Sequence, residues 1–373
     1  MTQVRRVYSA HTINTVALSI IGVYVPAYLL SLGYPLSQVI LFYVISHGVG
    51  LLFGLFIFVP LVQRWGLLNT FKIYYPLQII YLFLLSLLKT HQVMPEVVAI
   101  VNGLATFAYW IPLNIFMIKN SQSQEMGNNL SKFFALPNLF GILGPIIGAI
   151  LIPVVGFWPV FLITAIGLVL SYLPLAAIKD KEMKVTLNFS KALKRLARNK
   201  TLFVFEFLDN IIEESEWFWS IYVFLIIGSL VTPGIVGSLQ AIGGSIFTLL
   251  IGKYANKHSK KLIPLAAFLL LLFTVIKIFI TAPISAYVVT LIVSFILNFF
   301  LVVYFSTIYK TIKNDKEEEF MILREIPTVL GRMVVFGIIY LTLPYLKFFF
   351  LLPIVIIILL LFLYISKRKF LLE

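Results

Sequence analysis

The stretch from Asn199 to Ser220 contains a third of the chain's acidic residues, within sequence that is otherwise mostly apolar. The acidic residues in it are Glu206, Asp209, Glu213, Glu214 and Glu216, five of fifteen in the whole chain. A charge at bilayer depth costs roughly 2.5–3.5 kcal/mol on insertion scales, so such a residue normally faces a cavity or a partner of opposite charge. The stretch therefore predicts a helix with one acidic side bordering a polar space.

Helical spacing divides these residues into groups. At about 100° per residue, one narrow arc holds Glu206, Asn210, Glu213 and Trp217, with Asp209 beside it. Glu206 and Asp209 lie near the helix start, where negative charge is favourable, and we expect them to face cytoplasmic water. Glu213 lies about three turns deeper. A carboxyl group buried at that depth can bind and release a proton near neutral pH, so Glu213 is the predicted proton-exchanging residue.

Residues 322–343 supply the opposite charge. Arg332 lies about 15 Å into a helix that begins near residue 322, a depth similar to that of Glu213, and Glu325 shares its face. We predict that Glu213 and Arg332 interact. Two interpretations of these residues remain open, a salt bridge that holds the bundle together and a role in binding or gating. Arg324 and Lys277 are expected to extend toward opposite membrane interfaces.

Other kinds of chemistry find little support in the sequence. The chain has no cysteine, and its four histidines are scattered without the spacing of metal ligands. It has no phosphate-binding loop, no nucleotide-binding fingerprint and no Ser-His-Asp set. We therefore expect no enzyme activity, no cofactor and no metal site.

The composition is that of a polytopic helical membrane protein. Hydrophobic residues make up 61% of 373 residues, charged residues 12%, and the mean hydropathy is +1.02. A membrane-spanning helix needs about 20 mainly apolar residues. Such runs predict twelve spans near 11–32, 36–61, 69–88, 94–118, 131–153, 156–178, 201–228, 232–252, 262–281, 284–309, 322–343 and 346–366.

Lysine and arginine predict the orientation of these spans. Placing both termini in the cytoplasm puts nearly all the basic connections on the inside and leaves only Lys89 and Lys347 outside. The net charge of +14 is therefore a topology signal that also suits anionic lipid headgroups, and we expect no nucleic-acid partner. The predicted location is the cell (inner) membrane.

The longest connection lies at the middle of the chain. Its second half, Asn188 to Lys200, alternates apolar and basic residues as an interfacial amphipathic helix does. We expect three parts: a six-helix bundle over 1–178, a cytoplasmic linker over 179–200 and a second six-helix bundle over 201–373.

Two equivalent loops resemble each other and a known family. The loop after the second span contains Leu61, Arg64 and Gly66, and the loop after the eighth reads Gly252-Lys-Tyr-Ala-Asn-Lys-His-Ser-Lys-Lys261. Both resemble the Gly-x-Leu-Ala-Asp-Arg-x-Gly-Arg-Lys loop of the major facilitator superfamily. Gln63 and Asn256 replace the acidic residue of that motif. Gly144-Pro-Ile-Ile-Gly-Ala149 in the fifth span is similar to a Gly-Pro-x-x-Gly-Gly element of the same family.

The resemblance implies an all-α fold of twelve transmembrane helices in two six-helix bundles related by pseudo-two-fold symmetry. In that family the first, fourth, seventh and tenth helices line the cavity. Besides the acidic helix, those spans offer Tyr24, Asn102, Trp110, Asn114, Trp217 and Asn298. Ala99 stands where drug/proton antiporters of the family place an arginine.

The expected function is secondary active transport of a small solute by rocker-switch alternating access. Acidic and aromatic lining favours proton-coupled export of a cationic or amphipathic compound. Alternatives are uptake of a small anionic solute on Arg332, and a non-transporting scaffold or lipid-handling protein. The expected partners are the solute, protons or another coupling ion, and membrane lipids, with the chain acting as a monomer.

Overall fold

The computed structural model describes residues 3–90, 92–120, 133, 137–178, 194, 200–312 and 317–366, and every regular element in these ranges is helical. The predicted linker over 179–200 lies almost entirely outside the described residues. Eight described stretches are long and apolar enough to cross a membrane, and the remaining crossings contain charged residues or shorter helices. Adding α12, the two limbs of α13 and the α15–α16 pair to these eight stretches gives twelve crossings in the described residues.

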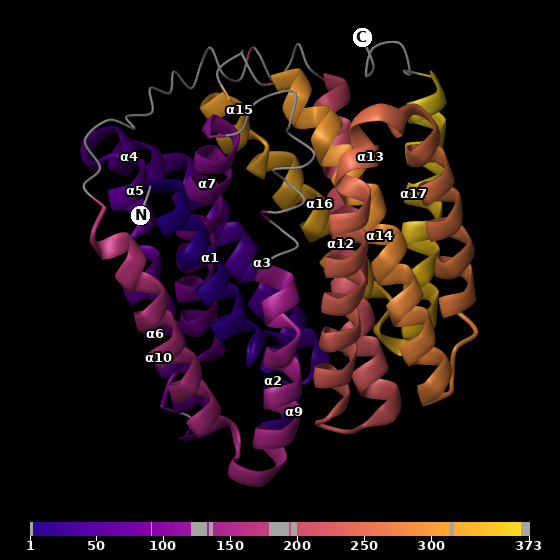
Figure 1. The fold of residues 1–373 in the computed structure, drawn as a ribbon. Helices are drawn as coiled ribbons and strands as arrows, with labels where there is room; N and C mark the ends of the chain where they lie inside the picture. The colour runs from indigo at the N-terminus through magenta and orange to yellow at the C-terminus, as the bar shows by residue number, and fades with distance from the viewer. Residues whose placement is uncertain are drawn as a thin grey trace.

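Six crossings make up the N-terminal group of helices, drawn from indigo to magenta in Figure 1. Several are assembled from short helices joined end to end, because glycine and proline interrupt them. The elements are α1 (Gln3–Ser19), η1 (Gly22–Tyr24), α2 (Val25–Ser31), α3 (Leu36–Phe53), η2 (Gly54–Phe58), α4 (Val59–Trp65), α5 (Leu67–Phe71), α6 (Tyr74–Leu87), η3 (Leu88–Thr90), α7 (Pro95–Lys119), α9 (Leu143–Val155) and α10 (Phe157–Ala176).

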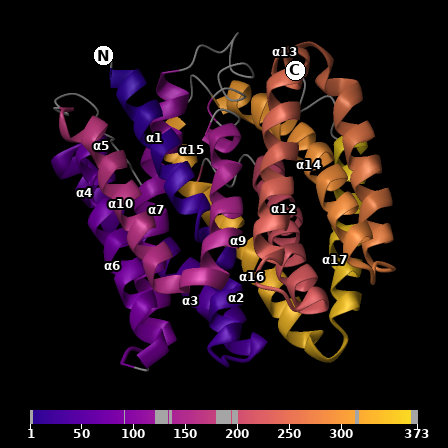
Figure 2. The same ribbon diagram turned by 60° about the horizontal axis from the view of Figure 1, so that its bottom comes forward.

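The C-terminal group, drawn from salmon to yellow, lies beside the first in both views (Figures 1 and 2). It comprises α12 (Lys200–Ile227), α13 (Thr232–Lys277), α14 (Pro283–Ile312), α15 (Glu317–Leu323), α16 (Glu325–Leu341), η5 (Leu343–Phe350) and α17 (Leu351–Ser366). The sequence predicted a loop between the eighth and ninth spans. Instead, the backbone stays helical through it as α13, which rises, arches over and descends (Figure 1).

The outer surface is apolar, as the surface of a protein in lipid must be. Val154, Ile284 and Phe362 are large apolar side chains, and each is more than two thirds exposed. Polar and charged side chains are found instead in the interior, where Asn14 and Asp209 are buried. This reversal of the usual arrangement in water agrees with the predicted membrane class.

Close packing between helices depends on glycine at a few positions. A Cβ on Gly103 of α7 would collide with the backbone carbonyl of Ser46 on α3. A Cβ on Gly331 of α16 would lie 2.6 Å from the carbonyl oxygen of Phe207 on α12. Small residues of this kind allow the backbones of membrane helices to touch. They determine how α7 and α16 are rotated against their neighbours.

The helix that contains Arg332 is broken near its start. Pro327 has no N–H to donate to the carbonyl of Leu323, so the helical hydrogen bonding is interrupted there. The break at Arg324 separates α15, which packs against α7 of the N-terminal group, from α16, which packs mainly against α12. One crossing therefore contacts both groups of helices.

Candidate functional site

A cavity of about 580 Å³ lies between the two groups of helices. The N-terminal group lines it from α1, η1, α3, α6 and α7, and the C-terminal group from α12 and α14. Polar side chains on its wall are His11, Asn14, Thr15, Ser19, Gln78, Asn102, Thr106, Asn138, Glu213 and Asn298, and aromatic ones are Tyr43, Tyr74, Tyr81, Tyr109, Trp110 and Trp217. We call this space the central cavity. Five predicted site residues lie on it: Asn102, Trp110, Glu213, Trp217 and Asn298.

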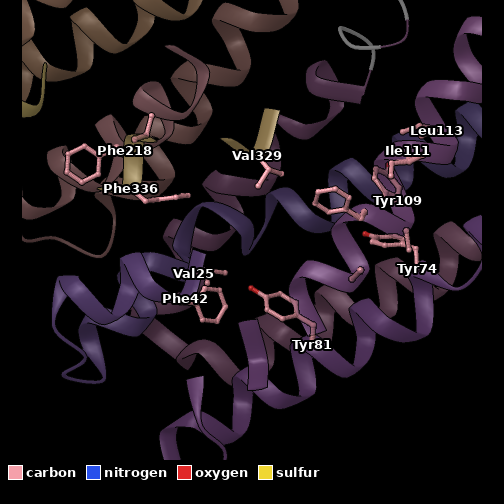
Figure 3. Close-up of a cluster of buried hydrophobic side chains, with 14 of the residues drawn as sticks. Val25, Phe42, Tyr74, Tyr81, Tyr109, Ile111, Leu113, Phe218, Val329 and Phe336 are labelled. Carbon is pink, nitrogen blue, oxygen red and sulfur yellow. The ribbon is translucent and has the colours of Figure 1, made fainter. Parts of the chain in front are cut away.

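The N-terminal wall of the central cavity is rich in hydrogen-bonded polar and aromatic side chains. His11 Nδ1 and the Tyr109 hydroxyl lie 2.6 Å apart, and the Tyr74 hydroxyl donates to Asn14 Oδ1 at 2.8 Å. The rings of Tyr74 and Tyr109 pack with their centroids 4.5 Å apart, side by side in Figure 3. Asn102 Nδ2 donates to Ser46 Oγ at 2.8 Å. This wall offers hydroxyl, amide, imidazole and aromatic ring surfaces, and no Asp, Glu, Lys or Arg is among its described lining residues.

The sequence did not point to His11, Asn14, Tyr74 or Tyr109 as site residues. A single histidine without ligand spacing is a weak signal, and tyrosine is frequent throughout the chain, with 18 residues. Only Asn14 could have been identified from the sequence, because it is the one amide side chain in the apolar span 11–32.

The C-terminal wall contains the acidic helix. Glu213 and Trp217 lie one turn apart on α12, and both are partly exposed to the cavity. The Trp217 ring meets Tyr43 of α3 at 4.4 Å and Phe336 of α16 at 5.9 Å between centroids. This aromatic cluster joins the two groups of helices at one edge of the central cavity.

Glu213 also borders a second, smaller cavity of about 210 Å³. Its wall includes Trp110 and Asn114 of α7, Asn210 of α12, and Arg324, Glu325, Thr328 and Arg332 at the α15–α16 helix. The amide of Asn210 donates to the carbonyl of Glu206 at 2.8 Å and to Thr328 Oγ1 at 3.2 Å. Asn114, Asn210, Glu325 and Arg332 are therefore brought together beside Glu213, away from the main space.

Arg332 forms an ion pair with a different carboxylate from the predicted one. Its Nε lies 3.1 Å from Oε2 of Glu214, so the ion pair of Arg332 is with Glu214 and not with Glu213, the predicted partner. The two glutamates are adjacent in sequence and therefore differ by about 100° around the helix. Glu214 faces α16, which leaves Glu213 free to face the cavities.

The expected exposure of Glu206 and Asp209 was also wrong. Both are buried, at 1% and 0% exposed, because α16 covers this face of α12. Glu206 Oε2 lies 3.3 Å from Nη2 of Arg324, and Arg324 is itself buried and does not extend to an interface as predicted. Neither Glu206 nor Asp209 is among the residues that line the two cavities described above.

Lys277 was also predicted to extend toward a membrane interface, and it is buried instead. It is 0% exposed and donates to Oε1 of Glu216 at 2.6 Å, with its ammonium 4.8 Å above the ring of Trp219. Trp219 in turn donates to Thr290 Oγ1 at 2.9 Å. These contacts connect α12, α13 and α14 inside the C-terminal group, so a packing role explains Lys277 better than an interfacial one.

Tyr24 is packed away from the central cavity. It is 0% exposed, and its hydroxyl donates to the carbonyl of Pro145 on α9 at 2.8 Å. A Cβ placed on Gly148 of α9 or on Gly234 of α13 would overlap its ring or hydroxyl. Tyr24 therefore belongs to the contact between α9 and α13, which joins the two groups of helices, and its predicted place in the cavity lining was wrong.

Metal-binding clusters are not found in the described residues, where no three histidine or acidic side chains are grouped closely enough to hold an ion. Of the two motif-like loops, the first lies at the end of α4, where Gly66 has a φ of +86°. The side chains of the second, at 252–261, lie outside the described residues.

Comparison with known proteins agrees with this architecture. A search of curated protein sequences found no match to the chain. Among solved structures, the E. coli fucose:proton symporter FucP is similar over 97% of this chain and 98% of that one, with a TM-score of 0.70 and 13% identity. A bacterial homologue of the iron transporter ferroportin, in an outward-facing state, is similar over 99% and 100%, with a TM-score of 0.72 and 14% identity.

At these identities the structural likeness shows the fold alone. The fold is that of twelve transmembrane helices in two six-helix bundles, and the predicted fold class is confirmed. The model of the Major Facilitator Superfamily matches residues 7–319 of the chain. Because that match covers most of the sequence and the fold agrees over nearly all of it, the chain belongs to the Major Facilitator Superfamily of membrane transporters.

Proposed function

We propose that the protein is a secondary active transporter that moves a small solute by rocker-switch alternating access. The observation that supports this most directly is the central cavity, which both groups of helices line. A site shared between two bundles opens to either side when one bundle rocks against the other. Its volume of about 580 Å³ lies within the range of about 300–1,000 Å³ of small-molecule sites.

The chemistry of the cavity supports a cationic or weakly basic amphipathic solute. Glu213 is the acidic side chain on its wall, with Trp110 and Trp217 nearby to provide aromatic faces for a cation. The hydroxyl and amide groups of the N-terminal wall would bind the neutral part of the solute. Uptake of an anionic solute on Arg332 is less well supported, because Arg332 is paired with Glu214 and borders the smaller cavity.

Proton coupling is proposed at Glu213. A carboxyl group that faces the binding space can hold either the solute's positive charge or a proton, but not both at once. This competition would exchange protons for solute across the membrane and drive export. The proposal extends to the membrane arrangement: bundles over 1–178 and 201–373, a cytoplasmic linker over 179–200, both termini in the cytoplasm of the cell membrane, and a monomer surrounded by lipid.

The test begins with binding and continues to flux. Purified protein is screened by thermal shift against organic cations, organic anions, sugars and amino acids, since ligands stabilise the state they bind. A hit is then followed as radiolabelled flux in proteoliposomes under an imposed pH gradient. The control is Glu96→Gln, in the first turn of α7 and outside both cavities. The expected result is gradient-driven flux of a cation that Glu213→Gln abolishes and Glu96→Gln preserves. Stabilisation by anions alone, lost in Arg332→Gln, would favour the anionic alternative, and no flux with any bound compound would favour a non-transporting protein.

A further inference from the structure

Asp209 is the most deeply buried acidic side chain on α12. It is 0% exposed, and neither of its carboxylate oxygens has a hydrogen-bond partner among the described residues. The ion pairs recorded for α12 involve Glu206, Glu214 and Glu216, each with a base of its own. Glu206 also lacks a hydrogen-bond donor, but Arg324 lies 3.3 Å from it, and Glu213 is partly exposed on the cavities. Among the described residues, Asp209 has neither a base within ion-pair distance nor contact with either cavity.

An ionised carboxylate in such surroundings is very unfavourable. An unpaired charge loses its hydration when it is buried, and the group normally becomes neutral instead. A neutral carboxyl needs a bound proton. The geometry therefore indicates a protonated side chain at a position where no cavity of the site described above reaches.

The surrounding charges agree with this interpretation. The charged groups around Asp209 are Glu206 and Glu213 on its own helix, and Arg324 and Arg332 on the facing α15–α16 helix. Arg324 is already paired with Glu206, and Arg332 with Glu214. With Glu325 included, five carboxyl groups share two arginines here, so full ionisation would leave three uncompensated negative charges in the interior.

We propose that Asp209 is a proton-holding site, separate from the solute-binding carboxyl Glu213, that is discharged when an arginine of the α15–α16 helix becomes its partner. Close packing at Gly331 ties this face of α12 to α16, so any sliding of α16 changes which carboxylates the arginines meet. On discharge the O–H bond of Asp209 breaks, its electron pair stays on the carboxylate, and the guanidinium pairs with that charge.

The released proton has a short route to water. Glu213 lies four residues further along α12, about 6 Å along the helix axis, and it borders the central cavity and the smaller one. The proton passes to the Glu213 carboxylate or to water beside it. If the protein transports a solute as proposed, Asp209 is a second proton carrier in the transport cycle. That role rests on the proposed function, whereas the presence of a bound proton on Asp209 does not.

The proton-holding part is tested without any solute. Infrared difference spectra of the purified protein in lipid nanodiscs distinguish the carbonyl band of a protonated carboxyl from the bands of carboxylates. At neutral pH the wild type should show that band, and Asp209→Asn should lose an area equivalent to one carboxyl. The matched control is Glu206→Gln, one turn away and paired with Arg324, which should leave the band unchanged.

Further measurements distinguish loss of the protonated carboxyl from loss of folding. Asp209→Glu retains the acid and should shift the band without removing it. Asp209→Asn replaces a neutral group by a neutral group of the same shape, so its Tm should stay within about 2 °C of the wild type. A wild type without the band, a band that persists in Asp209→Asn, or a large loss of stability in that variant would each overturn the proposal. None of these results would decide whether the protein transports a solute.

Discussion

Arg332 pairs with Glu214, and its Nε lies 3.1 Å from Oε2 of that residue, while the neighbouring Glu213 borders the central cavity and the smaller cavity beside Arg332. The adjacent carboxylates of Glu213 and Glu214 therefore have different roles. Glu214 neutralises a buried arginine between α12 and α16, and Glu213 remains available to a solute or a proton. The pair also connects the acidic helix to the broken α15–α16 crossing.

Breaking this pair should destabilise the protein. The side chains of Arg332 and Glu214 are 23% and 10% exposed, so Arg332→Gln leaves a largely buried carboxylate without its base. The expected loss is about 3–5 kcal/mol, and Arg332→Gln with Glu214→Gln should lose less than the sum of the two single variants. Unfolding in detergent measures all three. The comparison is a second double-mutant cycle, of Arg332→Gln with Glu213→Gln. If the coupling energy between Arg332 and Glu213 is larger than that between Arg332 and Glu214, the Arg332–Glu214 pairing is rejected.

Neutralising Glu213 should separate binding from proton coupling. Glu213→Gln retains the shape of the side chain and removes its titration, so accumulation driven by a pH gradient should be lost while exchange without a gradient continues. Binding of a cationic solute should weaken at least about tenfold, or about 1.4 kcal/mol. Its pH dependence should also flatten, since proton and solute affinities are linked. Glu206→Gln, buried and outside both cavities, should retain gradient-driven transport, and the opposite ranking would move the coupling site.

The Lys277–Glu216 pair should contribute to stability more than to transport. Lys277→Met leaves Glu216 as an unpaired carboxylate inside the C-terminal bundle, with an expected cost of about 3–5 kcal/mol. Adding Glu216→Gln removes that charge and should recover much of the loss. Thermal unfolding of both variants measures this difference. If the double variant is no more stable than Lys277→Met alone, the ion pair is not the source of the effect.

One glycine at the contact between the bundles should control their relative positions. A side chain on Gly234 would overlap the Tyr24 hydroxyl and lie 2.5 Å from the carbonyl of Pro145. Gly234→Ala should therefore disfavour the observed contact of α9 with α13 and shift the bundles toward another arrangement. Accessibility of single cysteines near that contact should rise in Gly234→Ala. Gly337→Ala on α16, where a Cβ meets nothing within 4 Å, is the control and should leave accessibility unchanged.

The topology is tested by labelling, because the chain has no cysteine of its own. Single cysteines at Ser190 and Gln92 should report opposite sides of the membrane if the distribution of lysine and arginine sets the orientation. An impermeant thiol reagent applied to intact cells should reach position 92 only. Labelling of position 190 instead would reverse the proposed orientation.

Local sequence was enough to predict the membrane class, the crossings and the acidic helix. Hydropathy and basic loops are properties of short windows, so spans such as 94–118 agree with α7 to within a few residues. The same is true of Glu213 and Trp217, because helical periodicity places them one turn apart wherever the helix lies. Asn102, Trp110 and Asn298 were predicted from the resemblance to the family, and they line the central cavity as well.

Only the tertiary structure decided which buried charges meet. Choosing Glu214 over Glu213 requires the rotation of α12 against α16, which depends on the backbone contact at Gly331. Lys277 is hydrogen-bonded to Glu216, 61 residues away in sequence, and Tyr24 to Pro145, 121 residues away. Such pairings arise from close packing between helices that are distant in sequence. The pattern within one helix contains no information about that rotation.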